Sequence, residues 1–369
     1  MVRTVIYGGS FDPIHRGHEA IINNLAARFD EVIVVPTSVS PFKQGGSAAT
    51  SQQRWQMLCA CHFPSNVWLS DYEINKAGCS YSIDTVRHFA SKDRELYFAI
   101  GSEGARSLNK WRNADELKRL CKFYAIKRPG YDGGEHCADI VMADFCGEDV
   151  SSSEVKLAIA FDRLQGLVNE RVAKIIKEND LYNDYNHFTA AFKTFGLSDK
   201  RINHTYNAAG EGIKLAKRYD VDIKSVIIAL ILHDIGKNMT AESLKKIGIS
   251  APDCSHLPIE VRHAEYGAAI AEQMYNQPKE ICDAIRTHTV CGMDMTELAE
   301  IVALADYIEP SRCFDGVDEV RKAACEDLSL AIQMMLKNTI DYLQQQGKYV
   351  VPITKQVYDL YTKKIKKEE

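Results

Sequence analysis

The segment that most constrains the fold lies near the start of the chain and reads VIYGGSFDPIHRGHEAII, at residues 5–22. A β-branched apolar run meets two glycines, and helix-favouring residues follow after a short turn. A buried strand that passes directly into a helix is typical of a parallel sheet covered by helices. His15 and His18 lie in the connection, on either side of Arg16-Gly17. The segment therefore predicts an α/β fold with two histidines beyond the end of its first strand.

The same alternation continues through the first half of the chain. Helical stretches such as EAIINNLAARF and IDTVRHFAS separate apolar runs that we expect to be buried strands, namely TVIYGG, EVIVVPTS, ELYFAIG and KFYAIKRPG. Strand and helix follow each other in turn up to about Leu181. This order predicts a doubly wound parallel α/β sheet.

The second half has a different pattern. From His187 onward apolar residues recur at helical spacing, as in HTYNAAGEGIKLAKRY, VRHAEYGAAIAEQM and LSLAIQMMLKNTIDYL. Alternation typical of strands is almost absent there. The 369 residues suffice for two domains of ordinary size. We predict an α/β domain over residues 1–185 and an all-α domain over residues 186–369.

Charge and composition narrow the possible partners. The net charge of −5 gives no general attraction to nucleic acid or to an anionic membrane, so any phosphate-binding site must be local. The first residues are too soon interrupted for a signal peptide, and the longest apolar run, SVIIALIL, is far short of a membrane span. The eleven cysteines follow no disulfide spacing, which predicts reduced thiols and a cytoplasmic protein. The sequence leaves open whether the chain forms a homo-oligomer.

The connection after the first strand has the residues of a phosphate site. In a parallel α/β sheet, ligands bind beyond the carboxyl ends of the strands, where helix N-termini offer N–H groups to anions. Gly8 and Gly9 allow the backbone to approach a phosphate, because no Cβ stands in the way. Gly17 lets His15 and His18 face one site, and histidine can donate to a phosphate oxygen. The pair suits a triphosphate, whereas an isolated H-x-x-H would be read as two surface histidines.

The string GGSFDPIHRGH resembles the G-x-F-D-P-x-H-x-G-H signature of the nucleotidyltransferase superfamily. Within that superfamily the first 180 residues or so resemble bacterial nicotinate-nucleotide adenylyltransferases, also through VPTSVSPFKQ, TSQQRWQML, GCSYSIDTV, IGSEGARSLNKW and VSSSEVK. The resemblance implies catalytic roles for His15, His18 and Lys43. It implies nucleotide or substrate binding by Gly8, Gly9, Ser10, Phe11, Arg54, Ser80, Tyr81, Asp84, Thr85, Gly101, Glu103, Trp111, Ser151, Ser152, Ser153 and Lys156.

Two positions depart from the pattern of that family. Glu103 stands where the family has an aspartate, and Lys156 stands where it has an arginine, so the bidentate fork is lost while the charge is kept. Both changes bear on substrate affinity and rate. Trp111 has two interpretations of equal weight, a core aromatic residue or a residue that stacks on the nicotinate ring.

The resemblance implies a reaction between nicotinate mononucleotide and ATP. The phosphate of the mononucleotide would attack the α-phosphorus of ATP in line, giving nicotinate adenine dinucleotide and pyrophosphate without a protein nucleophile. Catalysis would come from positioning and from charge stabilisation by the two histidines, Lys43 and Lys156, with Mg²⁺ on the phosphates of ATP.

The second half carries histidines and carboxylates on separate helical segments. In SVIIALILHDIGKN a buried helix ends in His233 and Asp234. Burying such groups against an apolar helix costs free energy unless something pairs with them, and a metal ion does so. Further candidates of this kind are His204, His263, His288 and Asp306. For His187 and His256 we expect an ordinary core or surface role.

The order H…HD…H…H…D resembles the HD-domain metal-dependent phosphohydrolases. The segments RINHT, ILHDIGK, VRHAEYGA, AIRTHT and ALADYIEPSR together resemble one branch, the symmetrical dinucleoside tetraphosphate hydrolases. The resemblance implies two metal ions, which can activate a shared water and hold the phosphate that is attacked. Imidazole and carboxylate ligands suit iron, manganese or zinc better than magnesium, and the resemblance favours iron. It implies that His204, His233 and Asp306 bind one ion, that His263 and His288 bind the other, and that Asp234 bridges them.

Three hypotheses follow. The first is a bifunctional enzyme that makes an NAD precursor and splits diadenosine tetraphosphate into two ADP, with Lys237 near the attacked phosphate as a catalytic residue or as a solvated lysine. In the second, only the hydrolase is active and the N-terminal domain is a nucleotide-binding regulatory module. The third makes the helical half a metal-stabilised dimerisation module, against which the complete ligand set argues. The preferred mononucleotide and the polyphosphate length stay open.

Overall fold

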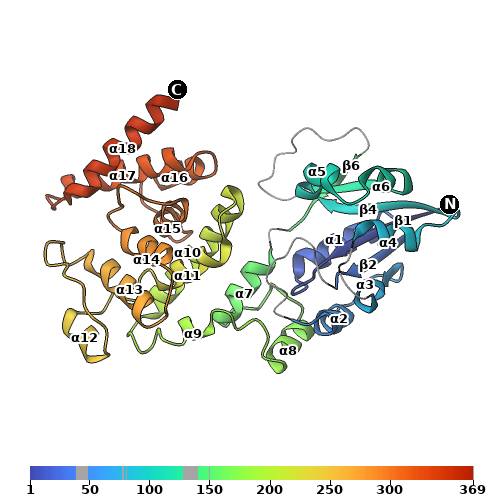
Figure 1. Cartoon of the computed structure of the whole chain (residues 1–369), viewed down its shortest axis with the longest axis horizontal. Coiled ribbons are helices and arrows are strands. Elements are labelled where there is room, and N and C mark those ends of the chain that lie inside the picture. Colours follow the sequence, from blue (N-terminus) through green and yellow to red (C-terminus); the bar gives the residue numbers. More distant parts are fainter. Residues whose placement is uncertain (39–48, 77–78, 80, 128–139, 149, 369) are drawn as a thin grey trace. The chain divides into compact units, whose positions relative to one another are not determined.

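The computed structural model describes residues 1–38, 49–76, 79, 81–127, 140–148 and 150–368, with the main chain alone at residues 102, 103, 367 and 368. These residues form two compact units, Met1–Asn183 and Asp184–Glu369. Within the described ranges, all the strands belong to the first unit and the second unit is helical (Figure 1). The second unit is thus all-α, as predicted.

The first unit is built on a six-stranded parallel sheet in the order β3-β2-β1-β4-β5-β6. The chain begins in the middle of the sheet, builds outward on one side, and then crosses over to build outward on the other. This reversal confirms the predicted doubly wound fold and leaves a switch point between β1 and β4. The strands are β1 (Val2–Gly9), β2 (Glu31–Pro36), β3 (Val67–Leu69), β4 (Arg94–Gly101), β5 (Lys122–Lys127) and β6 (Ile140–Cys146).

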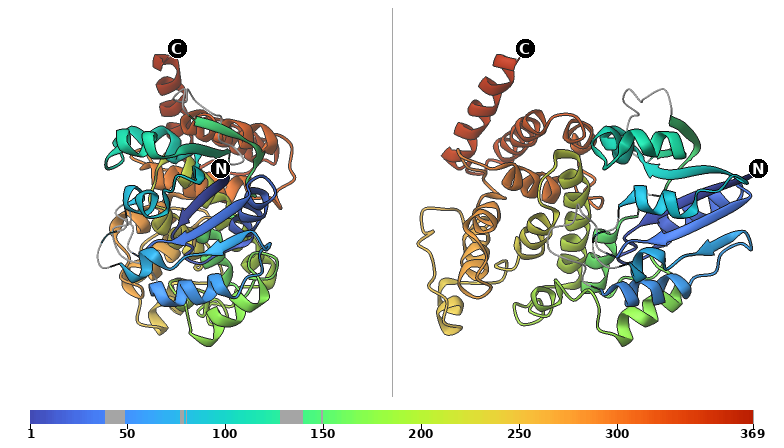
Figure 2. Two further views of the ribbon diagram at one scale, coloured as in Figure 1. Left: turned by 90° about the vertical axis from the view of Figure 1, so that its right-hand side faces the viewer. Right: turned by 45° about the vertical axis from the view of Figure 1, so that its right-hand side comes forward.

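Helices cover both faces of this sheet, because successive residues of a strand point to opposite sides. In β1 the fully buried Val5 belongs to one apolar core and the fully buried Ile6 to another. Figure 2 shows the strands as one twisted layer with helices beside it. The helices of this unit are α1 (Arg16–Ala26), α2 (Ser51–Cys59), α3 (Tyr72–Asn75), α4 (Ser82–Phe89), α5 (Ser102–Ser107), the 3-10 helix η1 (Leu108–Lys110), α6 (Ala114–Leu120), α7 (Ser152–Ala160) and α8 (Glu170–Glu178).

The four predicted strands are confirmed, and two edge strands occur in addition. An edge strand pairs on one side only, so it keeps exposed side chains and lacks the continuous apolar run of a central strand. Trp68 of β3 and Val141 of β6 are examples of such exposed residues. With three residues, β3 is also too short to show a periodicity.

The second unit packs its helices around α11, whose apolar residues Val226–Leu232 are all buried. A helix that is apolar on every side belongs in the centre of a bundle. In the part of the chain that the structure describes, no helix is long and apolar enough to cross a membrane. The helices are α9 (Asn186–Thr189), α10 (Asp199–Tyr219), α11 (Ile223–Leu232), α12 (Ala241–Lys246), α13 (Arg262–Gln273), α14 (Lys279–Thr287), α15 (Glu297–Ile308), α16 (Val317–Ala324), α17 (Leu328–Gln345) and α18 (Pro352–Glu368).

Side-chain hydrogen bonds tie the last helix, α18, to the bundle. The hydroxyl of Tyr361 donates to the buried carboxyl of Glu300 on α15. The hydroxyl of Thr354 donates to the main-chain oxygen of Val290 at 3.1 Å. One face of α18 is therefore docked on the bundle.

Candidate active sites

The turn between β1 and α1 brings His15 and His18 together. Their rings stack with centroids 3.7 Å apart and planes at 27°. The buried ring of Phe11 meets His18 edge-on, at 5.0 Å between centroids. A Cβ on Gly17 would lie 3.1 Å from His15 Nδ1, and a Cβ on Gly9 would lie 3.0 Å from the Phe11 ring. A Cβ at either position would press on the neighbouring ring, which would have to move by a few tenths of an ångström.

A cavity of about 600 Å³ opens beside this turn, at the carboxyl ends of β1 and β4. This is the switch point of the sheet, where doubly wound folds bind nucleotides. Seven of the predicted residues line the cavity, namely Gly8, Gly9, Ser10, His18, Tyr81, Gly101 and Trp111.

Trp111 and two cations form one side of this cavity. The Trp111 indole packs edge-on against Phe98 with centroids 6.1 Å apart, so this partly buried residue contacts the apolar core and also lines the cavity. Lys110 and Arg112, which the sequence did not single out, line the cavity beside it. The Arg112 guanidinium carbon lies 4.4 Å from the centre of the Tyr81 ring, a cation–π contact. Positive charge and two aromatic rings thus meet at this wall.

Arg54 is buried, with 2% of its surface exposed. Its Nη1 donates to the carbonyl oxygen of Ser10 at 2.6 Å, and its Nη2 donates to that of Ser38 at 2.8 Å. Burial is the main cause that lowers the pKa of the Arg54 guanidinium. In this structure Arg54 braces the loops that follow β1 and β2.

Lys156 also supports the turn. Its Nζ lies 3.7 Å from Asp12 Oδ2 and 5.1 Å from the centre of the Tyr182 ring. The Tyr182 hydroxyl donates to Asp12 Oδ1 at 2.7 Å. Asp12, in the D-P part of the signature, is therefore held by residues from the C-terminal end of the first unit.

Three more predicted residues have partners within the protein. Asp84 Oδ2 accepts from Lys76 Nζ at 2.6 Å, and the buried Thr85 hydroxyl donates to Glu73. Ser151 caps α7, because its hydroxyl accepts from the main-chain N–H of Glu154 at 3.4 Å.

The remaining predicted residues of the first unit are placed as follows. Ser152 and Ser153 form the first turn of α7. Lys43 and Ser80 lie outside the described residues, as does the side chain of Glu103.

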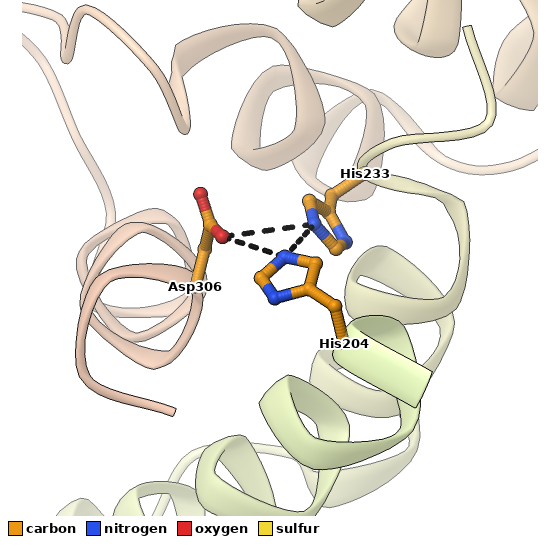
Figure 3. A group of neighbouring side chains, drawn as sticks. All are labelled: His204, His233 and Asp306. Atoms are coloured by element: carbon orange, nitrogen blue, oxygen red, sulfur yellow. Dashed lines mark hydrogen bonds and ion pairs between the residues drawn. The ribbon is translucent and has the colours of Figure 1, made fainter. Parts of the chain in front are cut away.

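Five helical segments bring the predicted metal ligands of the second unit to one place. His204 comes from α10, His263 from α13 and Asp306 from α15, while His233 and His288 follow the last residues of α11 and α14. His204 Nε2 lies 2.9 Å from Asp306 Oδ1 and 3.3 Å from His233 Nε2 (Figure 3). The sets His204, His233, Asp306 and His233, Asp234, His288 each have ligand atoms within 4.8 Å of one another.

The four imidazoles are prepared for metal binding. Each Nδ1 lies within hydrogen-bonding distance of an oxygen, which favours the tautomer with its proton on Nδ1 and leaves the Nε2 lone pair for the centre. His263 Nε2 and His288 Nε2 are 3.3 Å apart, as are those of His204 and His233. Two lone pairs at this distance repel unless a cation lies between them. Donor atoms that share an ion through bonds of about 2.0–2.1 Å lie about 3.0–3.4 Å apart, so the geometry fits metal ions.

Asp234 has the orientation of a bridging ligand. Its Oδ2 lies 3.4 Å from His233 Nε2, and its Oδ1 lies 3.1 Å from His263 Nε2. Lys237 Nζ lies 3.6 Å from Asp234 Oδ1 and 3.1 Å from His263 Nε2. Burial is the main cause that lowers the pKa of His288 to about 3, which keeps this ring neutral and able to bind a metal.

Three charged residues of this centre were missed by the sequence analysis. Arg201 Nη1 pairs with Asp234, and Arg312 Nη2 donates to Asp306 Oδ1 at 2.9 Å. Glu309 accepts from the His204 ring. A signal was present, because Arg201 precedes His204 by one helical turn and the other two follow Asp306 at spacings of three and six.

Comparisons with known proteins divide the chain in the same way. A cytidylyltransferase-like family matches residues 6–158, and the HD domain family matches residues 201–311. A protein of Mycoplasma pneumoniae called probable nicotinate-nucleotide adenylyltransferase/Ap4A hydrolase is 29% identical over 347 residues, which are 90% of this chain and 98% of that protein.

Two relatives each match one half. The symmetrical bis(5'-nucleosyl)-tetraphosphatase of Bacillus subtilis is 39% identical over 168 residues, covering 44% of this chain and 90% of that protein. A probable nicotinate-nucleotide adenylyltransferase of Clostridium acetobutylicum is 33% identical over 207 residues, covering 49% of this chain and all of that protein. An HD domain implies that the second unit binds divalent metal.

Proposed function

Because the chain belongs to the nicotinate-nucleotide adenylyltransferases in its first half and to the symmetrical bis(5'-nucleosyl)-tetraphosphatases in its second half, we propose that it is one bifunctional enzyme with domains over residues 1–185 and 186–369. The first domain transfers an adenylyl group from ATP to nicotinate mononucleotide. The second hydrolyses diadenosine tetraphosphate to two ADP. The cytoplasm is the expected location.

For the transferase, the observation that carries the proposal is the stacked histidine pair beside a cavity at the switch point of the sheet. The mononucleotide phosphate attacks the α-phosphorus of ATP in line, and pyrophosphate leaves. His18, which lines the cavity, donates to a phosphate oxygen as charge develops there, and His15 holds its ring in place. Mg²⁺ brought in with ATP would neutralise charge on the phosphates. Lys43 is assigned to the phosphate side on the motif alone.

We assign the acceptor as nicotinate mononucleotide rather than nicotinamide mononucleotide. Nicotinate carries a carboxylate, and Lys110 and Arg112 place positive charge on the cavity wall that Tyr81 and Trp111 share. A guanidinium can meet a carboxylate through two parallel hydrogen bonds, and the neutral amide offers a weaker partner. We expect Arg112→Leu to lower kcat/KM for the nicotinate nucleotide more than for the nicotinamide nucleotide. Equal losses for both would remove this role from Arg112.

For the hydrolase, the observation that carries the proposal is the convergence of four Nε2 atoms on the two carboxylates Asp234 and Asp306. We propose iron as the preferred metal, with manganese and zinc as alternatives. When bound, a pair of such ions supplies an activated water and holds the phosphoryl group. Asp234 bridges the two ligand sets, and Lys237 beside it neutralises charge on the attacked phosphate. Arg201 and Arg312 add positive charge at the same centre.

The purified full chain tests both halves. It should form nicotinate adenine dinucleotide from ATP and nicotinate mononucleotide, and ADP from diadenosine tetraphosphate, with about two equivalents of transition metal per chain. If the protein hydrolyses diadenosine tetraphosphate and binds nucleotides but transfers no adenylyl group, the first domain is a regulatory module rather than a transferase. Absence of hydrolysis in the metal-loaded protein would refute the second assignment.

A further inference from the structure

One of the four metal-facing imidazoles is held differently from the others. His233, His263 and His288 each direct Nδ1 to the main-chain oxygen three residues earlier, at 2.6–2.8 Å. His204 directs Nδ1 to the carboxylate of Glu309, 3.1 Å from Oε1. Among these four ligands, the described residues give only His204 a negatively charged partner at Nδ1.

Glu309 is itself held in place. It is 1% exposed. The main-chain N–H of Ser311 donates to its Oε2 at 2.8 Å, and the Ser311 hydroxyl donates to its Oε1. The amide of Asn207, on the same helix as His204, donates to Oε2 at 3.3 Å. A buried carboxylate with this many donors keeps its orientation and fixes that of the His204 ring.

The turn that begins at Glu309 also holds Asp306, another proposed ligand of the ion that His204 would bind. Arg312, three residues on, donates from Nη2 to Asp306 Oδ1 at 2.9 Å and from Nε to the Asp306 main-chain oxygen at 3.2 Å. From α16, Arg321 donates to three main-chain oxygens around this turn at 2.8–2.9 Å. One braced turn therefore positions both His204 and Asp306.

We infer that Glu309 is a positioning residue that makes the site of His204, His233 and Asp306 the tighter of the two metal sites. The inference rests on the ligand sets of the proposed function. By accepting the Nδ1 proton, Glu309 keeps His204 in the tautomer whose Nε2 lone pair faces the ion. Its negative charge also makes Nε2 a stronger donor to a cation. The two sites therefore differ in affinity, and this one fills first.

The test is a titration of Mn²⁺ into the metal-free full chain, followed by calorimetry and by electron paramagnetic resonance. The parent protein should bind two ions in separate steps. Glu309→Gln keeps the size of the side chain and removes its charge, so the tighter step should weaken about 10- to 100-fold while the weaker step is unchanged. Thermal unfolding of the metal-free variant shows whether it is folded.

Glu260→Gln is the matched control. Glu260 stands three residues before His263 and meets its Nδ1 through the main-chain oxygen, while its own side chain is exposed. The same substitution there should leave both binding steps at the parent values. Nitrogen NMR of histidine-labelled, metal-free protein adds a readout of the tautomer. His204 should carry its proton on Nδ1 in the parent and lose this preference in Glu309→Ala.

The possible results separate cleanly. Parent affinities in Glu309→Gln, or equal weakening of both steps, would overturn the role of Glu309 while leaving the metal centre intact. A parent protein that binds no Mn²⁺ and no other transition metal would overturn the proposed centre, and the inference with it.

Discussion

The imidazoles of His15 and His18 stack with ring centroids 3.7 Å apart, with only Arg16 and Gly17 between them in the chain. Stacking fixes the ring of His18 at the edge of the cavity, where one of its nitrogens can meet a phosphate. We therefore expect the pair to act as one unit, in which His15 orients His18 toward a substrate in the cavity.

His18→Ala should lower kcat of adenylyl transfer by about 100- to 1000-fold, as loss of one oriented donor to a developing charge typically does. Hydrolysis of diadenosine tetraphosphate by the same preparation should stay at the parent rate, because its ligands lie in the other unit. Steady-state assays of both reactions on one protein sample provide the measurement. A folded variant that transfers at the parent rate would show that His18 has another role.

Arg54→Ala should destabilise the first unit, because two loop carbonyls lose their buried donor. Each unsatisfied buried group costs about 1–3 kcal/mol. Denaturant unfolding of the variant measures the loss in the free energy of unfolding. The KM for ATP distinguishes an arginine that supports the loops from one that binds the nucleotide directly. A large rise in KM with unchanged stability would mean that Arg54 contacts the nucleotide.

Asp234→Ala should remove the metal, the hydrolase activity and part of the stability of the second unit, while transfer continues. Without a bridge the imidazoles face each other's lone pairs, so the helices that carry them should loosen. Metal analysis, both assays and thermal unfolding measure these effects. Asp341→Ala, at an exposed position, is the control. Two equivalents of bound metal in Asp234→Ala would exclude the bridge.

Two glycines of the second unit should respond oppositely to alanine. A Cβ on Gly236 would lie 2.5 Å from the His263 main-chain oxygen and 2.6 Å from the Gly267 nitrogen, so Gly236→Ala should cost about 1–3 kcal/mol and weaken metal binding. A Cβ on Gly210, inside α10, would meet nothing within 4 Å. Gly210→Ala should therefore stabilise the helix by about 0.5–1 kcal/mol. Unfolding curves measured at equal metal content test both predictions. A change in the free energy of unfolding with the same sign in both variants would contradict the packing around these glycines.

Glu300 should make the docking of α18 depend on pH. Burial is the main cause that raises the pKa of Glu300 above its ordinary 4.5, and the hydrogen bond from Tyr361 offsets only part of the effect. A carboxyl group whose pKa is higher in the folded state than in the unfolded state stabilises the folded state fully below its unfolded-state pKa. This stabilisation is lost as the pH rises through the folded-state pKa. Because the Gln side chain stays neutral, the free energy of unfolding of Glu300→Gln should exceed that of the parent at about pH 7. The difference should disappear below pH 4.5. A difference that does not change with pH would contradict this.

The sequence by itself determined the fold class and the candidate chemistry of both halves. Continuous apolar runs between helical stretches predict buried parallel strands, and β1, β2, β4 and β5 are found where those runs occur. The glycine-histidine turn and the histidine-aspartate series are also local patterns, since each residue type and spacing can be read from a short segment. Strands β3 and β6 lacked this signal because an edge strand needs no continuous apolar run.

Only the tertiary structure decided what individual side chains do. Arg54 and Ser38 are 16 residues apart, Asp12 and Tyr182 are 170 apart, and His204 and Glu309 are 105 apart, yet each pair is in hydrogen-bond contact. Such contacts depend on which elements pack together, and packing is set by the whole apolar core rather than by local pattern. A buried arginine or glutamate must find a partner, and the fold, not the neighbouring sequence, supplies it.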